Sequence, residues 1–179
     1  MRKLVMVMLA LALVAGCARD AARVSQPVRA ASLATVAVLP FFGPHGELFA
    51  DRINYELLQQ GADVIPKQTV VLLLKHEKLG NADFTSNAYR KRILQLGRKL
   101  GADTVVVGSV TPMDGGQTVI DEMRGVPGYK VATATMQFIA VSDGRVVSSA
   151  SYRNERSLAL LAATYHDVAH KLVAAALRR

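Results

Sequence analysis

The 179-residue sequence has a single cysteine, no tryptophan and few aromatic residues, which make up 6% of the chain. One cysteine excludes an intramolecular disulfide framework and any zinc site built from several thiolates. Acidic residues are also scarce, with 14 Asp and Glu against 22 Lys and Arg, while 51% of the residues are hydrophobic. This composition is that of a folded chain rather than a disordered or low-complexity one, and the length suits one domain.

The most apolar segment is too short to span a membrane. It runs over residues 4–15, which corresponds to roughly 18 Å of helix, whereas a bilayer core requires ~20 residues. Arg2 and Lys3 precede this segment, and Gly16 and Cys17 end it. A basic start, a short apolar stretch and a small-residue end are typical of a secretory signal, so the sequence predicts export.

The residues Val14-Ala15-Gly16-Cys17 resemble the lipobox of bacterial lipoproteins. The resemblance implies that residues 1–16 are a signal peptide and that the thiol of Cys17 carries acyl chains, each buried CH₂ contributing ~0.8 kcal/mol to membrane binding. In that class an Asp after the cysteine favours the inner membrane. Ala18 stands there instead, which implies an outer-membrane anchor with the chain on the periplasmic face. The alternative is an ordinary secretory signal with an incidental cysteine.

The segment after the signal is rich in Ala, Arg and Ser and has no sustained hydrophobic period. We therefore expect residues 17–33 to form a lipidated, flexible tether that reaches on the order of 20 Å, and residues 34–179 to form the folded domain. Without the signal, 20 basic residues remain against 14 acidic ones. In an exported protein this excess favours anionic headgroups, cell-wall polymers or acidic envelope proteins as partners, and not nucleic acid.

Short apolar runs alternate with helical periodicity in the first part of this domain. Three runs predict buried strands, at residues 36–39, 64–65 and 104–107. Hydrophobic residues spaced by three or four predict helices from about Glu47 to Gly61, from Pro66 to Gly80 and from Ser86 to Leu100. This alternation predicts an α/β fold: one compact domain with a mixed sheet and about four helices.

The last third of the sequence predicts an antiparallel hairpin followed by a long helix. Residues 131–141 and 146–152 are strand-like and are joined by Asp143-Gly144, a pair that favours a type I′ turn with positive φ at both central positions. Ser157 is expected to cap the final helix. Its hydrophobic stripe consists of Leu161, Tyr165, Val168, Leu172 and Ala176.

Several local sequences occur in a recognisable order, at residues 36–41 (VAVLPF), 50–52 (ADR), 64–67 (VIPK), 73–77 (LLKHE), 96–103 (LGRKLGAD) and 106–110 (VVGSV). Over residues 35–177 this order resembles a superfamily of envelope lipoproteins that includes the curli secretion channel CsgG, the penicillin-binding-protein activator LpoB, the flagellar lipoprotein FlgO and the amino-terminal domain of TolB. CsgG is the member to which we expect the chain to be closest. Two positions depart from the pattern of this superfamily: Pro66-Lys67 stands where an acidic residue or arginine is usual after the second strand, and Gly97 stands where alanine is usual.

The resemblance implies a fold and transfers no catalytic residue. It favours a non-enzymatic binding or accessory module of an envelope machine for secretion, cell-wall synthesis or flagellar assembly. The alternative is a homo-oligomeric secretion subunit of the CsgG type. Residues 80–88 are too few, and residues 111–130 too polar, for the membrane hairpins of that channel.

Individual residues of the best-matching segment have structural interpretations. Gly101 permits the left-handed conformation that ends a helix, and Asp103 can turn the chain into the next strand. Gly108 predicts either a bulge or a close approach of a helix to the sheet.

Histidines provide the only candidates for catalysis. His166 and His170 are one helical turn apart with Asp167 between them, which resembles a metalloprotease pattern and leaves a metal-dependent hydrolase as an alternative function. The usual Glu and a third downstream ligand are missing, so we expect no enzyme, no metal and no cofactor. His45, in a loop after the first strand, is a weaker candidate.

The helix expected over residues 86–100 has one apolar and one basic face. Tyr89, Ile93, Leu96 and Leu100 share the first face. The opposite half contains Arg90, Lys91, Arg92, Arg98 and Lys99. We interpret these five residues as a candidate dock for an acidic partner or for lipid headgroups, where each near-surface charge contributes ~1 kcal/mol. The alternative is a charged face that only contacts solvent.

Overall fold

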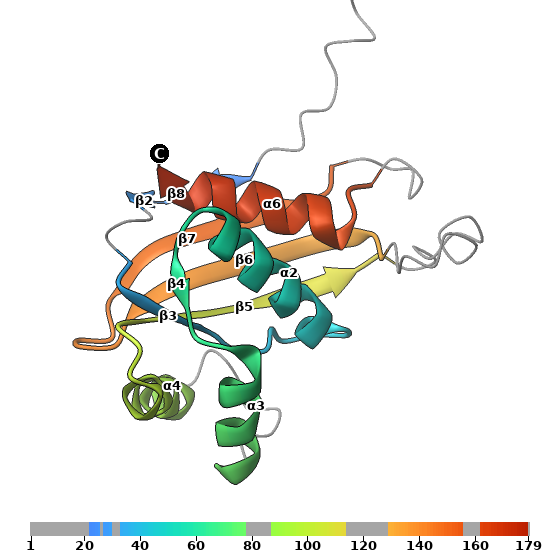
Figure 1. Ribbon diagram of the computed structural model, residues 1–179. Helices are drawn as coiled ribbons and strands as arrows, with labels where there is room; N and C mark the ends of the chain where they lie inside the picture. The colour runs from blue at the N-terminus through green and yellow to red at the C-terminus, as the bar shows by residue number, and fades with distance from the viewer. Residues whose placement is uncertain are drawn as a thin grey trace, which may run out of the picture.

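The computed structural model describes residues 22–25, 27–29, 33–77, 87–113, 129–155 and 162–178. Their centre is a six-stranded mixed sheet with the order β1-β7-β6-β5-β3-β4 (Figure 1). The strands β3 (Thr35–Val38), β4 (Asp63–Val64) and β5 (Thr104–Pro112) are parallel. The strand β6 (Val131–Ala140) pairs antiparallel with β5, and β7 (Val146–Arg153) pairs antiparallel with β6. At the edge, β1 (Arg23–Val24) pairs antiparallel with β7.

Four helices cover this sheet in the described part of the chain: α2 (Gly46–Gln59), α3 (Lys67–His76), α4 (Asn87–Leu100) and α6 (Tyr165–Ala176). The helices α2 and α6 pack on one face and α3 and α4 on the other. The predicted fold class is therefore confirmed, including the carboxy-terminal hairpin and the helix that follows it.

The two faces of the sheet bury separate hydrophobic clusters because alternate strand residues point in opposite directions. In β3, Val36 and Val38 face α2 and α6, whereas Ala37 faces α3 and α4. In β5, Val106 faces α2 and α6, whereas Val105 faces α3 and α4. Burial on both sides explains why these strands appear in the sequence as continuous apolar runs.

The expectation of a flexible tether over residues 17–33 is wrong for its second half. There, β1 pairs with β7, and β2 (Val28–Arg29) runs parallel to β8 (Leu177–Arg178), a short strand directly after α6. Leu33 is buried as well. The physical reason is that the outer edge of β7 and the end of α6 leave backbone groups and apolar surface that this segment covers.

Two local expectations about the carboxy-terminal part also need correction. The turn of the β6–β7 hairpin has positive φ only at Gly144 (73°) and not at Asp143, so it is not type I′. It is a wider loop, in which Gly144 N–H donates to Ala140 O and Ala140 N–H donates to Arg145 O. The final helix begins at Tyr165, where Thr164 and Asp167 form a capping box. Ser157 and Leu161 lie outside the described residues.

No helix among the described residues is long and apolar enough to cross a membrane. Cys17, the signal peptide and residues 114–128 of the polar stretch lie outside the part that the structure describes. The lipid anchor therefore stays a prediction.

Candidate functional site

The position of α4 against the sheet determines which of its side chains reach solvent. Tyr89, Ile93 and Leu96 are buried, as the periodicity predicted. At Gly97 a Cβ atom would lie only 2.7 Å from the Cγ2 atoms of Val105 and Val141. This close approach explains why a residue without a side chain stands at this position of α4.

The end of α4 is fixed by the residues that the sequence indicated. Gly101 has φ of 69° and ends the helix. Oδ2 of Asp103 accepts a hydrogen bond from Thr35 N–H at 3.1 Å, and Asp103 O accepts from Val141 N–H at 2.9 Å. Asp103 thus connects the start of β5 to both neighbouring strands, and α4 is held in one orientation relative to the sheet.

All five predicted basic residues of α4 are exposed, and the helix contains no acidic residue. Arg90 donates a hydrogen bond to the carbonyl oxygen of Gly144 in the hairpin. Lys99 pairs with Glu77, and this hydrogen bond lowers the pKa of the Glu77 carboxyl. Two of the five cations therefore have structural contacts.

The other three residues, Lys91, Arg92 and Arg98, form what we call the cationic face. None of the three has an ion pair with another residue of the described segments. Lys91 and Arg92 are adjacent and Arg98 follows two turns after Lys91, so the three charges lie on neighbouring surface of one helix. The structure thus reduces the predicted basic dock to three residues whose charges are available.

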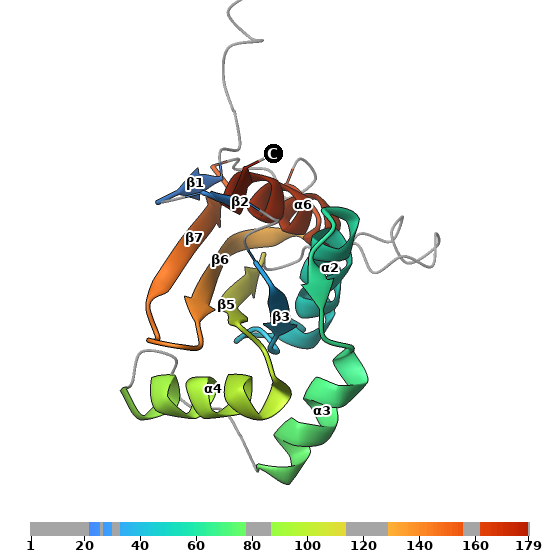
Figure 2. The same cartoon turned by 60° about the vertical axis from the view of Figure 1, so that its left-hand side comes forward.

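The cationic face and the amino-terminal strand lie at opposite ends of the sheet. In β7, Ser151 pairs with Arg23, whereas Gly144 contacts Arg90 and Leu94 of α4. Gly144 and Ser151 are seven positions apart in the chain, which corresponds to roughly 23 Å at ~3.3 Å per residue of extended backbone. Because β1 is antiparallel to β7, Arg23 is at the end of β1 that is farther from α4, and β1 and α4 lie at opposite ends of the sheet in Figure 2.

A second cluster joins α2 to α6 on the other face of the sheet. Nδ1 of His170 lies 2.8 Å from Oε2 of Glu56, and Nδ1 of His166 lies 3.8 Å from Oε1 of the same carboxylate. The Glu56 side chain is only 6% exposed, while both histidines are more than half exposed. The structure therefore brings the predicted pair together with a buried carboxylate.

Our sequence analysis did not identify Glu56, although a signal was present. Glu56 is next to Leu57 and three residues after Ile53, on the stripe of α2 that is buried. An acidic residue on an apolar stripe requires a partner, because an unpaired buried charge is costly. Nothing in the sequence says that the partner lies more than a hundred residues away.

His45 has a packing role in the structure. It is the residue before α2, in the left-handed region with φ of 57°, and its ring stacks on Tyr129 at 4.1 Å between centroids. The hydroxyl of Tyr165 donates to Pro44 O at 3.2 Å beside it, and burial raises the pKa of Tyr165 to about 12. These contacts hold the loop before α2 in place.

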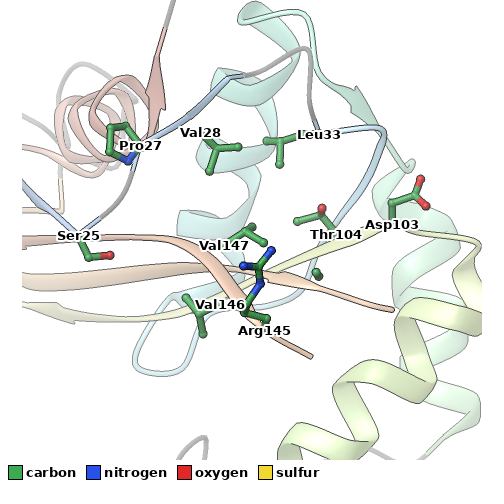
Figure 3. Close-up of a pocket in the computed structure, with 10 residues that line it drawn as sticks. Ser25, Pro27, Val28, Leu33, Asp103, Thr104, Arg145, Val146 and Val147 are labelled. Carbon is green, nitrogen blue, oxygen red and sulfur yellow. The ribbon is translucent and has the colours of Figure 1, made fainter. Parts of the chain in front are cut away.

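A cleft of about 970 Å³ lies between the amino-terminal segment and the start of β7. Figure 3 shows Val28, Leu33 and Val147 along it, with Arg145 and Asp103 among the polar residues. No histidine or cysteine is among its ten lining residues, and Asp103 already accepts the hydrogen bond from Thr35 N–H. The cleft has no pair of side chains suited to nucleophilic catalysis.

No protein-family model matches the sequence, and no curated protein matches it. Solved structures with a similar fold include a PelC dodecamer from Paraburkholderia phytofirmans (18% identity, 88% of this chain and 98% of that chain covered, TM-score 0.48). The lipoprotein GNA1162 from Neisseria meningitidis is 20% identical, with 66% and 79% covered and a TM-score of 0.45. LpoB from E. coli is 15% identical, with 69% and 59% covered and a TM-score of 0.47.

LpoB is one of the proteins named in the resemblance of the sequence, and at 15% identity the likeness concerns the fold alone. The expected closeness to CsgG stays a prediction.

Proposed function

We propose that this chain is a lipid-anchored, non-enzymatic binding module of the bacterial cell envelope. Cys17 holds it on the periplasmic face of the outer membrane, and the cationic face of α4 binds an acidic envelope protein. The observation that carries this proposal is the exposure of Lys91, Arg92 and Arg98 on a helix without any acidic residue. Complementary charge speeds association and selects partners of opposite sign.

The position of α4 favours a protein partner over the anchoring membrane. Residues 17–22 span at most roughly 18 Å when fully extended, and Arg23 is at the end of β1 that is farther from α4. With Cys17 in the bilayer, the cationic face is therefore presented to the periplasm. Lipid headgroups of the same membrane are the less favoured occupant.

Crosslinking in intact cells tests this assignment. A photo-crosslinking amino acid at Gln95, which is exposed between Arg92 and Arg98, should form an adduct with an acidic protein that mass spectrometry identifies. The double reversal Lys91→Glu/Arg92→Glu should abolish the adduct. The matched control Arg23→Glu/Arg153→Glu makes the same change in net charge at the opposite end of the sheet and should leave the adduct intact.

Equal loss of the adduct in both variants would show that only net charge matters, and would contradict the proposed face. Binding of the mature chain to vesicles of anionic lipid that depends on Lys91 and Arg92 would assign the face to headgroups instead. Light scattering of the same preparation tests the alternative of an oligomeric secretion subunit.

The anchor has its own test. Mass spectrometry of the native chain should find Cys17 at the amino terminus with acyl chains attached, and Cys17→Ser should release the protein from the membrane fraction. An unmodified thiol would refute the anchor without affecting the assignment of the cationic face.

A further inference from the structure

Glu56 orients the imidazole ring of His170 and lies close to that of His166. A carboxylate can only accept hydrogen bonds, so Nδ1 of His170 carries a proton and donates to Oε2 over 2.8 Å. Nδ1 of His166 meets the other oxygen of the same carboxylate at 3.8 Å. The hydrogen bond thus turns Nδ1 of His170 toward Glu56 and leaves its Nε2 on the side turned away from the carboxylate.

The two rings are also placed to act together. His166 and His170 are four residues apart on α6, so their side chains lie on the same face of the helix, one turn from each other. Their side chains are 57% and 59% exposed, whereas Glu56 is buried beneath them. A ligand in solvent thus has access to two neighbouring imidazoles, and the ring of His170 is oriented from within the protein by its hydrogen bond to Glu56.

We propose that His166 and His170 bind a divalent late transition-metal cation through their Nε2 atoms, with Glu56 as the carboxylate that holds the rings. Imidazole nitrogen suits Zn²⁺, Ni²⁺ and Cu²⁺. Metal-binding histidines typically donate their other ring N–H to a carboxylate or carbonyl, which fixes the ring and strengthens the ligand. The inference is independent of Cys17 and of the cationic face.

The protein supplies two ligands to this site, and water completes the coordination. Within the described residues no three His, Cys, Asp or Glu side chains are arranged to hold a metal ion together. Binding is therefore reversible, and Cu²⁺ should bind more tightly than Ni²⁺ or Zn²⁺. An ion across one turn of α6 also stabilises the start of this helix.

The chain contains its own internal reference, because its other two histidines are His45 and His76. The side chain of His76 is 85% exposed. In an NMR titration of the full mature chain with Cu²⁺, paramagnetic broadening should remove the imidazole signals of His166 and His170 first. The signals of His76 and His45 should persist to higher copper concentration.

Calorimetry with Zn²⁺ or Ni²⁺ then measures the effect of substitutions. His170→Ala, at an exposed position, should lower the affinity at least tenfold, and His76→Ala should leave it unchanged. Glu56→Gln should weaken binding by roughly 10- to 100-fold, as for other carboxylates behind metal-binding histidines. Imidazole nitrogen shifts provide a second readout, since His170 should lose its preference for the Nδ1–H tautomer in this variant.

Three outcomes would contradict the proposal in whole or in part. Broadening of His76 at the same copper concentration as the α6 pair would show adventitious binding by any exposed imidazole. Unchanged affinity in His170→Ala would exclude the pair as the ligands. If Glu56→Gln folds and binds metal as tightly as the natural chain, the role assigned to Glu56 is wrong.

Discussion

At the scale of single residues, close contacts between backbone and side chains explain the positions of several glycines. At Gly108 in β5, a Cβ atom would lie 2.0 Å from the carbonyl oxygen of Thr135 and 2.4 Å from the ring of Phe41. The expected close approach is therefore present, but an aromatic ring makes it and not a helix. The register shift in this pair of strands lies between Thr111 and Pro112, so Gly108 is not at a bulge.

The substitution Gly108→Ala should destabilise the fold. The added methyl group meets a backbone carbonyl, which cannot move without disturbing β6, so we expect the free energy of unfolding to fall by about 3 kcal/mol. Thr111→Ala, at an exposed position of the same strand, is the matched control and should change it by less than about 0.5 kcal/mol. Denaturant titration measures both, and similar values for the two variants would contradict the contact.

At the scale of elements, sequence periodicity was sufficient for the long helices and the buried strands. The stripe of Tyr89, Ile93 and Leu96 predicted α4, and the valines of β5 predicted a strand buried on both sides. The strands β1, β2 and β8 could not be predicted, because each has only two residues and none stands out in the sequence as an apolar run or a periodic pattern. They depend on tertiary contacts, such as Ser25 N–H donating to Ser149 O at 3.1 Å.

Removal of residues 18–29 tests whether these short strands contribute to stability. The deletion removes the pairing with β7 and with β8 and exposes the apolar surface that Val24 and Val28 cover. We expect the free energy of unfolding to fall by on the order of 2 kcal/mol. Deletion of residues 18–21 alone is the control, and equal stability of the two variants would mean that the segment only tethers the domain.

At the scale of the whole molecule, the candidate sites differ in how far sequence could predict them. The cationic face follows from one helix, so its residues were found, although the loss of Arg90 and Lys99 to structural contacts was not. The Glu56 cluster requires α2 and α6 to pack side by side, and its members are 114 residues apart. Long-range pairing of this kind is encoded in the fold and not in any local pattern.

The burial of two tyrosines predicts how the stability of the whole domain depends on pH in the alkaline range. Burial raises the pKa of Tyr89 and of Tyr165 to about 12, whereas an unfolded chain releases these protons near pH ~10. The native state thus holds protons that the unfolded state loses, so stability is complete below pH ~10 and decreases as the pH rises toward ~12.

Ultraviolet absorbance of phenolate should show a late phase near pH ~12 that becomes smaller in Tyr89→Phe and in Tyr165→Phe. Tyr89→Phe should make the alkaline loss of stability smaller, as measured by denaturant titration on both sides of pH ~10. Simultaneous titration of all five hydroxyls would contradict the burial of Tyr89 and Tyr165.

The pairing of β2 with β8 brings the beginning and the end of the domain together (Figure 1). A fluorescent protein or affinity tag fused to the carboxy terminus would therefore emerge beside β2, on the side of the domain where the described amino-terminal segment lies. Such a fusion would leave α4 unobstructed, and with Cys17 anchored as we propose it would be crowded by the bilayer. Reporters for this protein are better inserted elsewhere in the chain.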